Sequence, residues 1–257
     1  MNITHQFFRR LALSAANETL PRFRQPHDIT NKLENGFDPV TEGDREAERA
    51  IRKLIGEEFP DHGILGEEFG SHNLPNRHCW VIDPIDGTRA FISGLPLWGT
   101  LVGLLEDGDA VAGMMSQPFT GELFYATNGT AHYEGPGGPR ILKTRNTTDL
   151  ADATLCTTTP ALFPADERAR YDSVEASARL TRYGTDCYAY CMLAAGQVDL
   201  VVETGLQPYD IVALIPIIEA AGGVITTLDG GPAEKGGFVV AAATAKLHAV
   251  ALEILSA

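Results

Sequence analysis

The sequence is poor in cysteine and in basic residues, and each shortage narrows what the protein can be. Its four cysteines, Cys79, Cys156, Cys187 and Cys191, show neither a CxxC pair nor the spacing of a zinc site. Cys187 and Cys191 lie one helical turn apart, so we expect them to pack in the core of a protein from the reducing cytoplasm. Twenty Lys and Arg stand against 34 Asp and Glu, and the formal charge of −14 disfavours binding to nucleic acid or an anionic membrane.

Long hydrophobic runs are also missing. No apolar segment approaches the ~20 residues that span a bilayer, and the stretch after Arg9-Arg10 is too short for a secretory signal. The sequence has no GxxxxGK[ST] loop, GxGxxG fingerprint, GxSxG elbow or HExxH helix. Nucleotide-driven transfer, hydride transfer, serine hydrolysis and zinc proteolysis therefore have no support from motifs.

What the chain does contain predicts a mixed fold in two halves. Its 257 residues, 44% of them hydrophobic, suffice for one large globular domain or two smaller units. In residues 1–140, predicted strands are separated by Asp-Gly, Thr-Gly and Asn-Gly turns, which are typical of an antiparallel meander. In residues 141–257, strands and helices alternate as in α/β proteins, including one helix predicted from Asp210 to Ala221. We therefore expect an α+β N-terminal half and an α/β C-terminal half.

The most informative segment is an apolar strand pattern that delivers two carboxylates onto a turn, Trp80-Val81-Ile82-Asp83-Pro84-Ile85-Asp86-Gly87-Thr88. Asp83 and Asp86 face one point only if Pro84 and Ile85 turn the chain, and proline favours such an exit from a sheet. A plain turn, in which the Asp side chains accept hydrogen bonds from nearby amides, is the alternative. Gly87 and Thr88 then begin a short predicted helix, whose free amides and dipole suit a phosphate.

Two further acidic motifs, Glu67-Glu68 upstream and Asp210 downstream, favour convergence of several carboxylates. Carboxylates that converge without basic partners raise each other's pKa, because their charges repel. A hard divalent cation relieves this repulsion, since it prefers oxygen ligands and often combines a few carboxylates with substrate phosphate. The sequence therefore predicts a Mg²⁺-dependent phosphoester site.

These motifs resemble the metal-binding signatures of the inositol monophosphatase family, in the same order and over nearly the whole chain. The matching segments are Gly66-Glu67-Glu68, Asp83-Pro84-Ile85-Asp86-Gly87-Thr88 and Gln207-Pro208-Tyr209-Asp210. A closer resemblance, to the histidinol-phosphate phosphatases of that family, is carried by residues 86–92, 183–188 and 203–210. The resemblance implies a layered αβαβα sandwich (α+β / α/β), an active site between the two halves, two or three Mg²⁺ ions, a small phosphomonoester substrate and a homodimer.

The resemblance also implies roles for individual residues. The implied metal ligands are Glu67, Asp83, the carbonyl of Ile85, Asp86 and Asp210. The implied catalytic residues are Asp44, Thr88 and Glu67, of which Asp44 and Thr88 orient and deprotonate the attacking water. The implied substrate contacts are Gly87, Thr88, Arg89, Gly184, Thr185, Asp186, Glu203 and Asp210.

Asp44 and Asp186 each have two interpretations. Asp44 follows Thr41 at the start of a predicted helix, so it fits a capping box as well as a base for water. Asp186 fits a helix cap, and it also fits a wall that binds an ammonium or imidazolium group. Arg89 and Asp186 depart from the pattern of inositol-specific enzymes, which favours L-histidinol phosphate over inositol-1-phosphate or a related sugar phosphate. A non-catalytic anion-binding protein is disfavoured because every predicted metal ligand is present.

Overall fold

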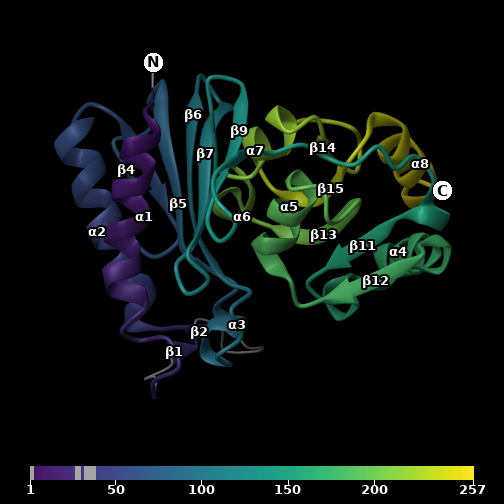
Figure 1. The fold of residues 1–257 in the computed structure, drawn as a ribbon, viewed down its shortest axis with the longest axis horizontal. Helices are drawn as coiled ribbons and strands as arrows, with labels where there is room; N and C mark the ends of the chain where they lie inside the picture. The colour runs from purple at the N-terminus through teal and green to yellow at the C-terminus, as the bar shows by residue number, and fades with distance from the viewer. Residues whose placement is uncertain (1–2, 27–29, 32–38) are drawn as a thin grey trace.

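The computed structural model describes residues 3–26, 30–31 and 39–257, and these form five layers. From left to right in Figure 1, two N-terminal helices cover an eight-stranded sheet, a middle layer of helices separates this sheet from a five-stranded one, and two helices close the far side. The predicted αβαβα sandwich is therefore confirmed. Among the described residues, no helix has the length and apolarity needed to cross a membrane.

The two longest helices of the described chain, α1 (His5–Thr19) and α2 (Glu42–Glu58), form the N-terminal layer. The other helices of the described residues are α3 (Thr88–Ile92), α4 (Ala165–Ser177), α5 (Asp186–Ala194), α6 (Pro208–Ile211), α7 (Ile215–Ala220) and α8 (Ala245–Leu255), with 3₁₀ turns η1 (Leu150–Asp152) and η2 (Pro160–Leu162). The prediction of one helix over residues 210–221 is wrong, because α6 and α7 are separate. Pro216 has no amide hydrogen for the carbonyl of Val212, so the helix is interrupted there.

The strands divide between a mainly antiparallel sheet, with order β10-β9-β8-β7-β6-β5-β3-β4, and a mixed sheet, with order β12-β11-β13-β15-β14. A separate two-stranded sheet joins β1 and β2. The strands are β1 (Thr30–Asn31), β2 (Pro39–Val40), β3 (Gly63–Gly66), β4 (Gly70–His72), β5 (His78–Asp86), β6 (Gly99–Glu106), β7 (Asp109–Gln117), β8 (Glu122–Thr127), β9 (Thr130–Glu134), β10 (Arg140–Ile141), β11 (Thr154–Thr157), β12 (Leu180–Tyr183), β13 (Leu200–Leu206), β14 (Val224–Thr227) and β15 (Gly237–Ala242).

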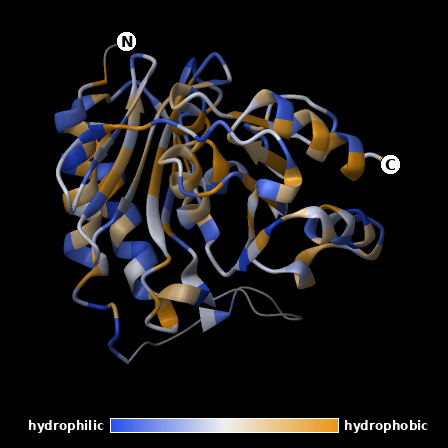
Figure 2. Cartoon of the chain, turned by 45° about the vertical axis from the view of Figure 1, so that its right-hand side comes forward, coloured by the Kyte–Doolittle hydropathy of each residue, from blue (hydrophilic) through white to orange (hydrophobic). Residues whose placement is uncertain are grey.

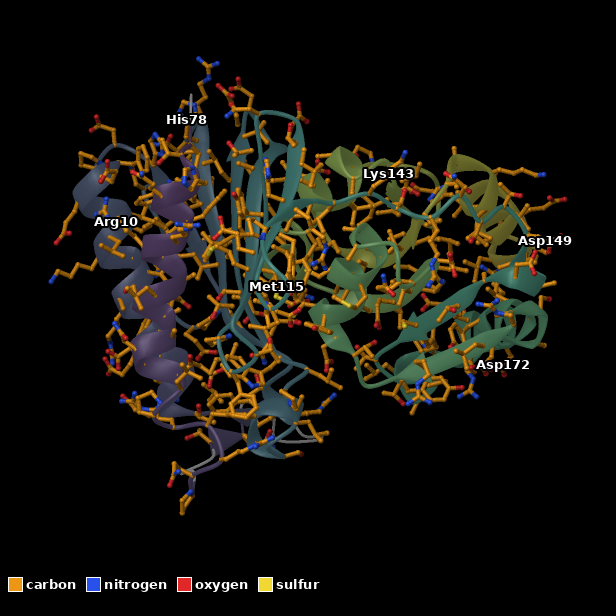
Figure 3. All side chains as sticks on the ribbon, in the orientation of Figure 1. Arg10, His78, Met115, Lys143, Asp149 and Asp172 are labelled. Atoms are coloured by element: carbon orange, nitrogen blue, oxygen red, sulfur yellow. The ribbon has the colours of Figure 1, made fainter. Side chains whose placement is uncertain are left out.

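Three hydrophobic clusters hold the layers together. The first joins α1 and α2 to the large sheet around Phe8, Ile51 and Trp80, and Figure 2 shows hydrophobic residues alternating with hydrophilic ones along these helices. The second fills the centre of the molecule and joins Met115 of β7 to residues of the middle helices; Figure 3 labels Met115 there. The third lies under α4 and α8. Cys187 and Cys191 are buried and free, which confirms their predicted place in the core.

Two facing glycines bring the middle helices close to the large sheet. Gly103 of β6 pairs with Gly113 of β7, and both lie against the segment between α6 and α7. A Cβ atom on Gly113 would come within 2.0 Å of the carbonyl oxygen of Ala213, and one on Gly103 within 2.8 Å of the amide nitrogen of Ala213. The missing side chains therefore set how closely α6, which carries Asp210, approaches β5 and β6.

Candidate active site

A cavity of about 380 Å³ gathers most of the predicted site residues at the junction of the large sheet and the middle helices. Its lining includes Glu67, Asp83, Ile85, Asp86, Gly87, Thr88, Arg89, Asp186, Glu203 and Asp210. Asp44, Gly184 and Thr185 lie outside this lining. Among the described residues of the wall, Arg89 is the only basic one, so the cavity is strongly acidic.

The carboxylates of Asp83, Asp86 and Asp210 form the centre of the cavity, with one oxygen from each within 4.8 Å of the others. In a regular strand, residues three apart point to opposite faces. Here Asp83 pairs with Leu101 of β6 while Asp86 pairs with Gly99, so β5 contains one extra residue between them. This register shift turns both carboxylates towards the same space.

Hydrogen bonds within the turn hold the register shift in place. The hydroxyl of Thr100 donates to the carbonyl of Pro84 at 2.8 Å, and the amide of Ile85 donates to Asp83 at 3.0 Å. The local turn considered as an alternative is thus present, and it coexists with the convergence of carboxylates. Asp210 reaches the same point from the first turn of α6, where the amide of Gln207 donates to its carboxylate at 2.6 Å.

Burial and mutual repulsion favour the protonated form of this cluster. Burial is the main cause that raises the pKa of Asp83 well above its usual value, and the charges of Glu67, Asp86 and Asp210 add to it. Burial likewise raises the pKa of Asp86, with additions from Asp186 and Asp210. Ionising these carboxylates is costly when no cation is bound. A hard divalent cation would offset their negative charges, and it prefers oxygen ligands of this kind.

Glu67 is held beside Asp83 by a buried acid, Glu48 of α2. Glu48 is fully buried, and it accepts hydrogen bonds from the amide of Glu68 at 2.7 Å and from the side chain of Arg52 at 2.6 Å. A Cβ atom on Gly66 would lie only 2.0 Å from a Glu48 carboxylate oxygen. Glu48 and Gly66 together therefore fix the corner that presents Glu67.

Asp44 has the predicted capping geometry at the start of α2. The amide and the hydroxyl of Thr41 donate to the same carboxylate oxygen, Oδ2, at 2.7 and 2.6 Å. The side chain is buried, and burial raises its pKa to about 7, with smaller additions from Glu68 and Glu67. The capping box is confirmed, while the role of Asp44 as a base stays a prediction.

The turn after Asp86 leads into α3 as predicted. Gly87 has a φ of +82°, which glycine adopts without strain, and a Cβ atom there would lie 3.3 Å from the carboxylate of Asp186. Thr88 begins α3, and its hydroxyl donates to the carbonyl of Ile85 at 3.1 Å. The amides at the start of α3 thus lie between the cluster of carboxylates and the wall that carries Asp186.

That wall is formed by the start of α5 and the ends of β11 and β13. The amide of Cys187, in the first turn of α5, donates to Asp86 at 2.7 Å. Asp186 precedes it with a φ of +40°, and its carboxylate accepts a hydrogen bond from Thr158 at 3.1 Å. The capping interpretation of Asp186 is therefore wrong, because Thr185 is the N-cap residue and the Asp186 side chain turns to β11 instead.

Glu203 of β13 faces Asp186 across Thr158. Its buried carboxylate accepts hydrogen bonds from the amide of Thr158 at 2.5 Å and from the hydroxyl of Thr157 at 3.3 Å. Burial is the main cause that raises the pKa of Glu203 to about 8, and the charge of Asp186 adds to it. The predicted contact Gly184 donates its amide to the carbonyl of Thr158 at 2.8 Å.

Sequence reasoning missed three residues of this site. Thr158 and Tyr190 line the cavity, and Glu48 supports Glu67. The hydroxyl of Tyr190 is buried without a hydrogen-bond partner among the described residues. Spacing offered a signal for two of them, because Glu48 follows Asp44, and Tyr190 follows Asp186, by one helical turn.

The layered fold and its carboxylate-lined cavity fit a metal-dependent phosphatase that hydrolyses phosphomonoesters. A model of the inositol monophosphatase family matches residues 4–257, and the chain belongs to that family.

The proteins that resemble this chain are named as different phosphatases. The chain is 40% identical over 245 residues to the "Bifunctional phosphatase IMPL2, chloroplastic" of Arabidopsis thaliana, covering 91% of this chain and 69% of the relative. It is 36% identical over 219 residues to a histidinol-phosphatase of Chlorobaculum parvum, covering 85% of this chain and 83% of the relative. A solved inositol monophosphatase from Zymomonas mobilis superposes with a TM-score of 0.87 at 39% identity, covering 98% of this chain and 97% of that one.

Proposed function

We propose that this protein is a Mg²⁺-dependent phosphatase that converts L-histidinol phosphate to L-histidinol and phosphate, a step of histidine biosynthesis. The observation that carries the proposal is the pair of neighbouring carboxylates, Asp186 and Glu203, on the wall that Thr158 organises. Histidinol phosphate carries an amine and an imidazole beside its phosphate ester. An acidic wall suits these nitrogen groups better than the hydroxyl groups of a sugar.

The metal ligands in this proposal are the carboxylates around the register shift of β5. Glu67, Asp83, Asp86 and Asp210, with the carbonyl of Ile85, would hold two or three Mg²⁺ ions, because all five line one cavity. Bound Mg²⁺ would supply positive charge to the phosphate and lower the pKa of a coordinated water.

Activation of the water is assigned to Thr88, Glu67 and Asp44. The hydroxyl hydrogen of Thr88 is directed to the carbonyl of Ile85, so its oxygen can accept a hydrogen bond from the water and orient it. Asp44 lies close enough to Glu68 and Glu67 for their charges to act on it, and its pKa of about 7 suits a proton acceptor near neutral pH.

The phosphate is assigned to the start of α3, and the rest of the substrate to the opposite wall. The amides of Gly87 and Thr88 would donate to phosphate oxygens, since Gly87 has no side chain to keep a ligand away from its backbone. Arg89, which is exposed at the rim of the cavity, would add positive charge. The organic part would contact Asp186, Glu203 and the segment that contains Gly184 and Thr185.

Inositol-1-phosphate is the second candidate substrate. It is supported by the solved inositol monophosphatase from Zymomonas mobilis, which covers almost all of this chain at 39% identity. A related sugar phosphate belongs to the same alternative. A non-catalytic anion-binding role has less support, because the carboxylates of the central cluster converge as a metal site requires.

The test is phosphate release from histidinol phosphate, inositol-1-phosphate and glycerol phosphate, measured side by side with Mg²⁺. We expect the highest kcat/KM for histidinol phosphate and the loss of all activity in EDTA. A higher kcat/KM for inositol-1-phosphate contradicts the proposed substrate. Activity that survives EDTA contradicts the metal site.

The homodimer follows from the family resemblance, and the cytoplasmic location from the predicted packing of the cysteines in the core. We propose a cytoplasmic homodimer. Each subunit consists of an N-terminal half (residues 1–140) and a C-terminal half (residues 141–257). Light scattering of the purified protein tests the dimer, and fractionation of the native cells tests the location.

A further inference from the structure

Thr158, which directly follows β11, uses all of its polar groups to connect three parts of the cavity wall. Its amide donates to Glu203 at 2.5 Å, and its carbonyl accepts from the amide of Gly184 at 2.8 Å. Its hydroxyl lies 3.1 Å from an oxygen of Asp186 and 3.0 Å from an oxygen of Glu203. One residue thus holds both acids and the segment that leads into α5.

The number of hydrogens available indicates which acceptor the Thr158 hydroxyl serves. A threonine hydroxyl has one hydrogen to donate, whereas two carboxylate oxygens lie within reach. Glu203 already accepts the amide of Thr158 and the hydroxyl of Thr157, so the hydrogen of the Thr158 hydroxyl is available to Asp186. A cation bound between the two carboxylates favours the ionised form of both, and an ionised carboxylate accepts about four hydrogen bonds, so each keeps acceptor positions for the substrate.

The backbone conformation of Asp186 indicates that neighbouring contacts hold this residue in place. Its φ of +40° is unfavourable for a residue with a side chain. Strained residues of this kind persist where neighbouring contacts hold them, and they cluster at functional sites. The contacts here are the hydrogen bonds from Thr158 to Asp186 and from Gly184 to Thr158.

We propose that Thr158 is the residue that positions Asp186 and Glu203 as one receptor for a cationic nitrogen of the substrate. Both carboxylates have an oxygen about 3 Å from the same hydroxyl, so these oxygens lie at most about 6 Å apart. One ammonium or imidazolium group can therefore donate hydrogens to both. The inference rests on the proposed function, since it concerns how the site selects a nitrogen-containing phosphomonoester.

Three variants separate this role from simple support of the fold. Thr158→Val removes the hydroxyl and keeps the shape and the amide. Thr158→Ser keeps the hydroxyl. Thr157→Val is the matched control, because it removes a neighbouring buried hydroxyl that bonds Glu203 and not Asp186. The measurements are kcat and KM for histidinol phosphate and for glycerol phosphate, which has no cation, and the inhibition constant of L-histidinol.

The expected signature is a change in selectivity. A hydrogen bond to a charged group is worth about 1.5–3 kcal/mol, so Thr158→Val should lower the kcat/KM ratio of histidinol phosphate to glycerol phosphate by roughly 10- to 150-fold. The loss should lie mainly in KM, and the affinity for L-histidinol should fall in parallel. Thr158→Ser should restore most of the ratio, and Thr157→Val should change it much less.

Equal losses on both substrates, or the same change in ratio with Thr157→Val, overturn the inference while the proposed function stands. A wild-type protein that prefers inositol-1-phosphate overturns the proposed function and the inference with it. If Thr158→Val does not fold, Thr158→Ala is compared with Thr158→Ser, since these two differ only in the hydroxyl. Equal selectivity of the two then overturns the inference.

Discussion

Replacing Asp44 by Asn should stabilise the metal-free protein at alkaline pH and slow catalysis at the same time. Both hydrogen bonds from Thr41 reach a single carboxylate oxygen, Oδ2. The one amide oxygen of Asn can accept both, so the cap of α2 survives the change. What disappears is the ionisable group, together with the cost of charging it in a buried place.

The magnitude follows from the pKa of Asp44. Burial raises it from 3.8 to about 7, which makes ionisation in the folded protein more costly than in the unfolded chain by about 4 kcal/mol. Between these pKa values the folded state binds more protons than the unfolded state, so the contribution of Asp44 to stability is lost as pH rises. The Asn variant has no such loss, and its advantage should grow from about zero at pH 4 to several kcal/mol at pH 8.

The assay is urea unfolding of the wild type and of Asp44→Asn in EDTA across this pH range. Glu42→Gln is the matched control, since Glu42 is an exposed acid in the same turn of α2 and should show no comparable trend. With Mg²⁺ present, turnover of Asp44→Asn should fall by the ~10²–10⁴-fold typical of lost base assistance. A stability difference that does not change with pH refutes the role of burial, and undiminished turnover leaves Asp44 with a structural role alone.

The remaining predictions concern the metal cluster and the substrate wall. Asp83→Asn and Asp210→Asn should each abolish turnover, and each should raise the melting temperature in EDTA because like-charge repulsion is relieved; normal turnover in either variant would remove that residue from the metal site. Glu48→Gln should raise the Mg²⁺ concentration that gives half-maximal thermal stabilisation by the ~10–100-fold typical of groups behind a metal ligand, whereas an unchanged Mg²⁺ titration would make Glu48 a purely structural residue. Asp186→Asn should lower kcat/KM for histidinol phosphate by roughly 10- to 150-fold and far less for glycerol phosphate, with Glu203→Gln less selective; equal losses on both substrates would make Asp186 a general support of the site.

Local spacing revealed the parts of the site that lie in consecutive residues, and the family resemblance added distant residues such as Glu67, Glu203 and Asp210. The turn from Asp83 to Thr88 and the capping box of Thr41 and Asp44 depend on local geometry, and local spacing reveals them. The layered fold followed from the family resemblance, because periodicity alone indicates only a mixture of helices and strands. The interruption between α6 and α7 had a local signal in Pro216, which the hydrophobic pattern of that segment obscured.

Residues that act across long stretches of sequence were not found in this way. Thr158 acquires its place only when β11 pairs with β13 and brings Glu203 beside it. Glu48 looks like half of a surface ion pair with Arg52 until the corner at Glu68 folds over it. Neither residue stands in a local sequence motif that marks it as functional. Each gains its role only when distant strands and helices pack together.

The facing glycines of β6 and β7 have a consequence for how this enzyme can be damaged. Gly113 is remote from every proposed ligand in the sequence, yet a Cβ atom there would collide with the backbone at Ala213. The displaced segment adjoins α6, which carries Asp210, so the added methyl group would move Asp210 away from Asp83 and Asp86. The spacing of the proposed ligands therefore depends on the lack of a side chain at Gly113. Mutagenesis confined to the polar residues of the cavity would not detect this dependence.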